Sequence, residues 1–169
     1  MPYQVWNGPM PTTAAQQAVA TGTTIKTMLQ LATPSTRQIQ LLSWGFTADD
    51  APGADGVIEL LQTDVAATVT AHVSAGVQNL DPNGPASLLT LGSSATGYTA
   101  TAEGTPTASR VFDAVSLDSV AGNSSLTYAW QWMPDERPIV AASRFLRVRA
   151  TTPTTGIDLR CWVCFQEVG

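Results

Sequence analysis

The chain has 169 residues, 12% of them charged, and a formal net charge of −5 at pH 7. This length suits one domain with a single core, and the charged fraction lies well below the usual level of about 25%. Affinity for nucleic-acid phosphates comes from many lysine and arginine contacts. An acidic chain whose one lysine is Lys26 is therefore not expected to bind nucleic acid.

The N-terminal residues do not fit a secretory signal peptide. They carry no basic segment, and Pro2, Pro9 and Pro11 interrupt their apolar residues. No apolar run approaches the roughly 18 residues that a membrane-spanning helix needs. We therefore expect no membrane partner, and synthesis and folding in a cytoplasm.

Residues 1–23 are predicted to form an extended N-terminal arm. Tyr3, Val5 and Trp6 precede a stretch rich in proline, alanine, glutamine and threonine, in which a helix over 14–19 would be marginal. Aromatic anchors on such an arm are typical of interface hot spots. We predict that Tyr3, Val5 and Trp6 bind a neighbouring subunit; a flexible leader without contacts is the alternative.

Residues 24–169 are predicted to form one domain. Apolar and polar residues alternate with a period of two between prolines and glycines, which indicates β-strands. In chain order the predicted strands are residues 24–31, 37–46, 57–65, 65–77, 88–91, 97–102, 110–120, 126–132, 145–150 and 157–168. The fold class is all-β: an antiparallel β-sandwich, jelly-roll-like, with helix confined to a turn or two.

The titratable residues form no recognisable catalytic or metal-binding pattern. His72, the single histidine, is predicted to lie on the polar, solvent-facing side of the strand over 65–77, and no nucleophile motif accompanies it. Asp49, Asp50 and Asp55 lack the spacing of a calcium loop. We therefore expect no enzymatic activity, no catalytic residues, no cofactor and no metal.

Cys161 and Cys164 form a C-x-x-C inside the last predicted strand. Residues three apart on a strand point to opposite faces and lie roughly 10 Å apart, which is too far for a disulfide. We predict two reduced, structural thiols without a metal.

Leu126, Tyr128, Trp130 and Trp132 share one face of a predicted strand. A stripe of core residues is the favoured interpretation. A platform on which sugar rings stack, as in carbohydrate-binding β-sandwiches, is the other.

Basic residues concentrate near the C-terminus. Residues 137–169 carry five arginines against two acidic side chains, whereas residues 1–136 carry eleven acidic against three basic ones. A solvated strand face is one interpretation. The other is a complementary contact with another subunit, in which Arg147 and Arg149 are partner-binding candidates because arginine is the basic residue favoured at interfaces.

Five stretches carry a family resemblance: residues 42–46 (LSWGF), 57–61 (VIELL), 81–86 (DPNGPA), 98–104 (YTATAEG) and 138–149 (PIVAASRFLRVR). They are similar to small virion proteins encoded by tailed bacteriophages of actinobacteria, usually placed among the capsid genes. The last stretch also resembles a hairpin of many trimeric viral jelly rolls.

The resemblance implies a non-enzymatic capsid decoration protein. Such a protein sits on the capsid exterior of the virion, binds the major capsid protein as a homotrimer and stabilises the lattice. The resemblance carries over no site residues. The alternatives are a phage tail, baseplate or receptor-binding β module, and a carbohydrate-binding β-sandwich that exposes Trp130 or Trp132.

Overall fold

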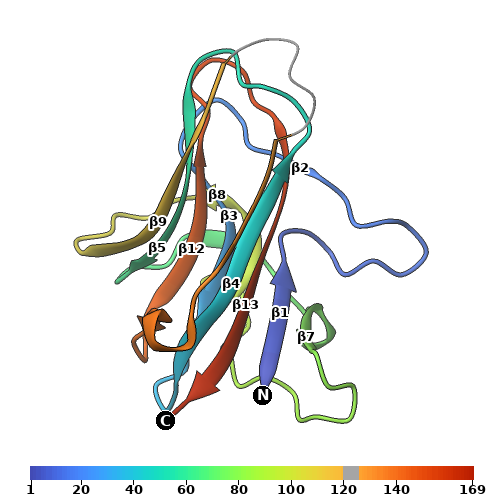
Figure 1. Cartoon of the computed structure of the whole chain (residues 1–169), viewed down its shortest axis with the longest axis vertical. Coiled ribbons are helices and arrows are strands. Elements are labelled where there is room, and N and C mark those ends of the chain that lie inside the picture. Colours follow the sequence, from blue (N-terminus) through green and yellow to red (C-terminus); the bar gives the residue numbers. More distant parts are fainter. Residues whose placement is uncertain (120–125) are drawn as a thin grey trace.

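The chain forms two antiparallel β-sheets packed face to face, as Figure 1 shows. The structure is a computed structural model that describes residues 1–119 and 126–169. Its strands are β1 Pro2–Trp6, β2 Val19–Ala20, β3 Lys26–Ala32, β4 Gln38–Ala48, β5 Gly56–Thr63, β6 Thr68–Ala71, β7 Val77–Asn79, β8 Gly97–Ala102, β9 Ser109–Leu117, β10 Leu126–Gln131, β11 Ile139–Val140, β12 Phe145–Thr151 and β13 Asp158–Val168. Two short 3₁₀ turns, η1 Ser74–Gly76 and η2 Pro134–Glu136, complete it. The predicted all-β sandwich is confirmed.

The strand pairing follows a simple rule. Sheet A has the order β10-β4-β13-β1-β7, and sheet B has the order β6-β8-β3-β12-β5-β9. Strand β1 pairs with β13, β3 with β12, β4 with β10 and β5 with β9, so the two halves of the chain pair in reverse order. Successive members of each half alternate between the sheets, which is the wrapping of a jelly roll.

No helix of the described residues is long and apolar enough to cross a membrane.

The inward faces of both sheets fill one hydrophobic core. The buried inward side chains of β12 and β13 are Leu146, Val148, Ala150, Leu159, Cys161, Val163 and Phe165. Every second residue of each strand points to the same face of its sheet. The alternation predicted for these two strands is therefore confirmed.

The N-terminal segment is extended, but its first strand is not a free arm. Strand β1 lies between β13 and β7 within sheet A (Figure 1). Tyr3 and Val5 are 3% and 0% exposed and belong to the chain's own core. The prediction that these two side chains bury themselves against a neighbour is therefore wrong. Tyr3 and Val5 alternate with Gln4 because these residues form a β-strand. That strand pairs within the chain's own sheet and not with a neighbouring subunit.

The rest of the predicted arm leaves the sheet and returns to it. After β1 the chain makes an excursion that touches sheet A through β2, which pairs with the start of β13. Residues 14–18 carry no helix, and the considered helix over 14–19 does not form. Asn7 fixes the beginning of the excursion, because its side chain bonds the Cys161 amide and the Leu159 carbonyl.

The predicted strand over 65–77 is broken in two. Strand β6 belongs to sheet B and β7 to sheet A, and the chain crosses between the sheets through η1. The Val/Ala alternation continues through the crossing, so it hides the break. His72 sits at this crossing, where it is 5% exposed, its Nε2 lies 2.8 Å from the Trp6 carbonyl oxygen, and its ring packs on Tyr98. The prediction of a solvent-facing histidine is wrong.

Two other predicted strands are shorter than expected. Residues 88–91 contribute isolated bridges, including one between Ala32 and Thr90, and form no strand of their own. Strand β9 ends at Leu117, and residue 120, the last of the strand predicted over 110–120, lies outside the described residues.

Replacing Val5 by alanine tests whether β1 is part of the core. We expect Val5→Ala to lower the free energy of unfolding by about 1.5–3 kcal/mol, because a fully buried side chain loses its contacts. Gln4→Ala, on the outward side of the same strand, should change it by less than about 0.5 kcal/mol. Denaturant unfolding measures both. Equal, small effects would mean that β1 is a dispensable arm.

The burial of His72 predicts a pH dependence. Desolvation lowers its pKa below the ordinary 6.5, and the hydrogen bond to Trp6 opposes that effect. The unfolded chain therefore takes up a proton first, and the contribution of His72 to stability is complete above pH 6.5 and is lost as the pH falls towards the folded pKa. From neutral pH to about pH 5, which is roughly 1.5 units below the ordinary histidine pKa, the free energy of unfolding should fall more for the wild type than for His72→Gln. Parallel pH profiles of unfolding would contradict this.

Candidate functional site

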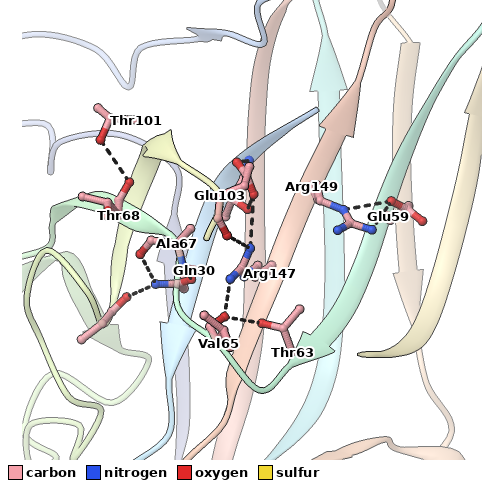
Figure 2. Close-up of polar contacts among 12 residues, drawn as sticks. Gln30, Glu59, Thr63, Val65, Ala67, Thr68, Thr101, Glu103, Arg147 and Arg149 are labelled. Carbon is pink, nitrogen blue, oxygen red and sulfur yellow. Dashed lines mark hydrogen bonds and ion pairs between the residues drawn. The ribbon is translucent and has the colours of Figure 1, made fainter. Parts of the chain in front are cut away.

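Arg147 is an internal clamp. It points to the outer face of sheet B, yet its side chain is 0% exposed, because residues 64–108, the insertion between β5 and β9, cover it. Figure 2 shows its guanidinium between Glu103 and Val65. Nη1 donates to the Glu103 carbonyl at 3.0 Å and to its carboxylate at 3.2 Å, and Nη2 donates to the Val65 carbonyl. The Glu103 carboxylate also accepts from the amide and hydroxyl of Thr27.

Gln30 adds a second attachment for the insertion. It lies opposite Arg147 in the β3–β12 register. Its Nε2 donates to the carbonyls of Ala67 and Ala95, and its Oε1 accepts from the Ala67 amide at 2.8 Å. Arg147 is therefore used within the chain, and its prediction as a partner-binding residue is wrong.

Arg149 lies two residues along the same face and outside the covered region. Its side chain is 21% exposed and pairs with Glu59 at 3.0 Å, as Figure 2 also shows. Its charge is thus balanced by a neighbour on the adjacent strand. A contact between Arg149 and a partner stays a prediction.

Trp6 forms part of an outer face of sheet A on which, among the described residues, the only charges near the tryptophan belong to one ion pair. Trp6, Trp162 and Gly45 lie in one row across β1, β13 and β4, and the two indole rings pack 5.1 Å apart. The Trp162 ring covers Gly45, where an added Cβ would lie 2.3 Å from it. The outward side chains around this row are Gln4, Gln40, Ser43, Cys164 and Gln166. Arg160, the next outward residue of β13, is paired with Asp49.

The two cysteines follow their predicted geometry. Cys161 is buried in the core, Cys164 lies on the outer face, and both are free. Burial raises the pKa of both thiols, and a hydrogen bond with Ser43 opposes the rise at Cys164. The strand assignment that put the thiols on opposite faces is confirmed.

The acidic loop is occupied by local contacts. Asp50 accepts from the Ala51 amide, and hydrogen bonds from the hydroxyl and amide of Ser119 lower the pKa of Asp55. Among the described residues, no three histidine, cysteine or carboxylate side chains gather into a possible metal site.

The predicted aromatic stripe on β10 divides into buried and exposed members. Tyr128 packs against Phe46 and Trp44, and Trp132 is 8% exposed. Leu126 and Trp130 are 42% and 49% exposed. The interpretation as a core stripe is wrong for these two, because β10 is the edge strand of sheet A and sheet B does not cover them.

Three members of the stripe, Tyr128, Trp130 and Trp132, line a groove, which is the candidate functional site. The groove opens between β10 and β9, the edge strands of the two sheets, and has a volume of about 340 Å³. Its lining residues are Phe112, Asp113, Tyr128, Trp130, Trp132 and Glu136. Four aromatic side chains and two carboxylates therefore meet at one open edge of the sandwich.

Asp113 joins the two sheets at the groove. Its Oδ2 accepts from Trp44 Nε1 at 2.9 Å and from the Tyr128 hydroxyl at 2.7 Å, and its Oδ1 accepts from the Ala114 amide. Desolvation, together with Asp113 as hydrogen-bond acceptor and negative charge, raises the pKa of Tyr128 to about 12. The phenol therefore stays protonated at neutral pH and donates to Asp113.

Sequence reasoning missed Phe112, Asp113 and Glu136. A signal for one of them exists: Asp113 is a carboxylate at an inward position of a predicted strand, a place that needs hydrogen-bond donors. Phe112 becomes visible only in the structure, because a β-bulge there breaks the pairing of β9 with β5 between Val111 and Asp113.

Comparison with protein-family models and with curated proteins finds no match to this chain.

Arg147 and Arg149 provide a matched pair of substitutions. Arg147→Met should lower the free energy of unfolding by about 3–5 kcal/mol, because it removes the buried guanidinium and leaves its partly buried partners Glu103 and Val65 unpaired. Arg149→Met should cost at most about 1 kcal/mol, because it breaks a partly exposed ion pair. Denaturant unfolding of the two variants checks the difference. Similar losses, or a larger loss at Arg149, would show that the insertion is not held by this clamp.

Proposed function

We propose that the protein is a non-enzymatic virion structural protein, a capsid decoration protein that binds the outside of the major capsid lattice. The outer face of sheet A is its attachment surface. The observation that carries this proposal is the packed pair Trp6 and Trp162 on that face, whose outward neighbours are uncharged apart from the Arg160–Asp49 ion pair at one end. The cores of protein interfaces are depleted in charge and enriched in tryptophan.

The shape of this face supports the same proposal. Strands β1, β13 and β4 supply a continuous row, and the Trp162 ring lies so close to Gly45 that no side chain would fit there. Gln40 and Gln166 bond each other across β4 and β13, so their polar groups are partly satisfied within the face. The part of this surface from Trp162 to Gln166 can pack closely against another protein without desolvating a charge, and the Arg160–Asp49 ion pair lies at its end.

The oligomeric state belongs to the proposal. A homotrimer matches the threefold positions of a hexagonal capsid lattice, because a closed symmetric oligomer binds equivalent sites best when it shares their symmetry. The low charge of the chain, 12%, suits a subunit that lies within a larger assembly. The family resemblance of residues 42–46 and 138–149 points to the same class of protein.

A lysine in the middle of the attachment face tests the proposal. Gln4 lies on this face between Tyr3 and Val5, so Gln4→Lys buries a charge at the interface and leaves the core unchanged. Ser116→Lys, an exposed position on the outer side of β9, is the control. We expect Gln4→Lys to weaken capsid binding at least tenfold, which corresponds to about 1.4 kcal/mol of binding free energy. Its melting temperature should not change. Ser116→Lys should bind as tightly as the wild type.

Two outcomes would contradict this proposal. Equal capsid binding by both variants would remove the outer face of sheet A from the contact. Recovery of the wild-type chain with tails, and not with tail-free capsids, would identify a tail or baseplate module instead.

A further inference from the structure

We propose that the groove between β9 and β10 is a binding site for neutral carbohydrate, with Trp130 as the stacking platform and Asp113 and Glu136 as hydrogen-bond acceptors. This site lies at the edge of the sandwich, on residues other than those of the attachment face on sheet A. The proposal therefore goes beyond capsid binding and does not depend on it.

Trp130 is the first observation. All five tryptophans of the chain lie in the described residues, and Trp130 alone is half exposed, at 49%. Its indole makes no hydrogen bond and no ring contact with any described residue, whereas Trp44 is packed on both Phe46 and Tyr128. A large apolar ring left open at a concave site is suited to the C–H face of a sugar ring, because the ring face carries negative charge density.

The bulge in β9 is the second, independent observation. The register shifts between Leu60 and Leu61, so Phe112 is left over in β9 and lines the groove together with Asp113, its neighbour in sequence. In a regular strand these two side chains would point to opposite faces. Bulges often aim side chains into binding sites, and this one brings an aromatic ring and a carboxylate to the same edge.

The polar groups of the groove fit hydroxyl donors. Asp113 is held in place by Trp44 and Tyr128. Its Oδ1 accepts one hydrogen bond from the described residues, from the Ala114 amide, so that oxygen keeps capacity for a further donor. The Glu136 carboxylate is exposed and makes no hydrogen bond or ion pair with a described residue. Because Asp113 is already fixed beside the ring face, its use as an acceptor costs little reorganisation when a ligand with several hydroxyls binds.

The charge of the lining selects the ligand class. Two carboxylates and no basic residue line the groove, so acidic sugars and phosphates are disfavoured; Arg110 stacks on Phe112 but is not part of the lining. Asp113 already accepts three hydrogen bonds, so it offers a single further acceptor position, which suits one sugar hydroxyl. The volume of about 340 Å³ lies at the lower end of small-molecule sites, which suits a short segment of a sugar chain.

The test uses the full chain on an array of neutral and acidic oligosaccharides, followed by titration of the best neutral binder in solution. Trp130→Ala should weaken binding at least about tenfold, as loss of a tryptophan anchor does. Leu126→Ala is the matched control, because Leu126 lies on the same face of the same strand, is similarly exposed, and does not line the groove. It should bind as tightly as the wild type.

Two further variants separate binding from folding. Trp130→Phe keeps an aromatic platform and should retain part of the affinity. It replaces Trp130→Ala in the test if that variant proves unstable. Glu136→Gln should weaken binding several-fold with an unchanged melting temperature. Absence of binding to every neutral oligosaccharide, preference for acidic ones, stronger binding of a choline or trimethyllysine probe, or equal loss in Leu126→Ala and Trp130→Ala would each overturn the proposal.

Discussion

The pairing of β13 with both β1 and β4 is the constraint on which the rest of the structure depends. One face of β13 contributes four fully buried side chains to the core, from Leu159 to Phe165. The other face places Trp162 against Trp6 on one side and over Gly45 on the other. Because β1 and β13 join the two ends of the chain, the jelly roll closes only when the first residues are in the sheet.

The same closure determines where the molecule is available to partners. Sheet A keeps an open outer face around the two tryptophans, with one ion pair at its end. The insertion over residues 64–108 covers part of the outer face of sheet B and binds Arg147. The two sheets end at β10 and β9, and the core is open there. Asp113 bridges that opening from β9 to Trp44 and Tyr128, which explains how an aromatic groove persists at an edge without collapsing.

Local patterns in the sequence identified the long core strands but did not show which strands pair with one another. The alternation around Leu146 and Val163 predicts both the strand and its buried face. The same kind of alternation at Tyr3 and Val5 does not say whose sheet the strand joins, because that depends on pairing with residues more than 150 positions away. Arg147 shows a related limit: its outward position was predictable, but its burial comes from Val65 and Glu103 of the insertion.

The candidate groove was predictable only in part. The stripe of Tyr128, Trp130 and Trp132 is visible in the sequence, and both a core stripe and a sugar platform agree with it. The choice depends on whether another sheet covers the strand, and Trp130 is open because β10 is an edge. Phe112 and Asp113 join the site through a bulge, which no period-two pattern reveals.

The proposed decoration role is tested most directly by the copy number of the chain in purified phage particles. Quantitative mass spectrometry gives the ratio of the chain to the major capsid protein in the same particles. A decoration protein should show a fixed ratio to the major capsid protein, set by the number of equivalent positions on the lattice. Tail-free capsids should keep the same ratio. A handful of copies per particle, lost with the tail, would contradict it.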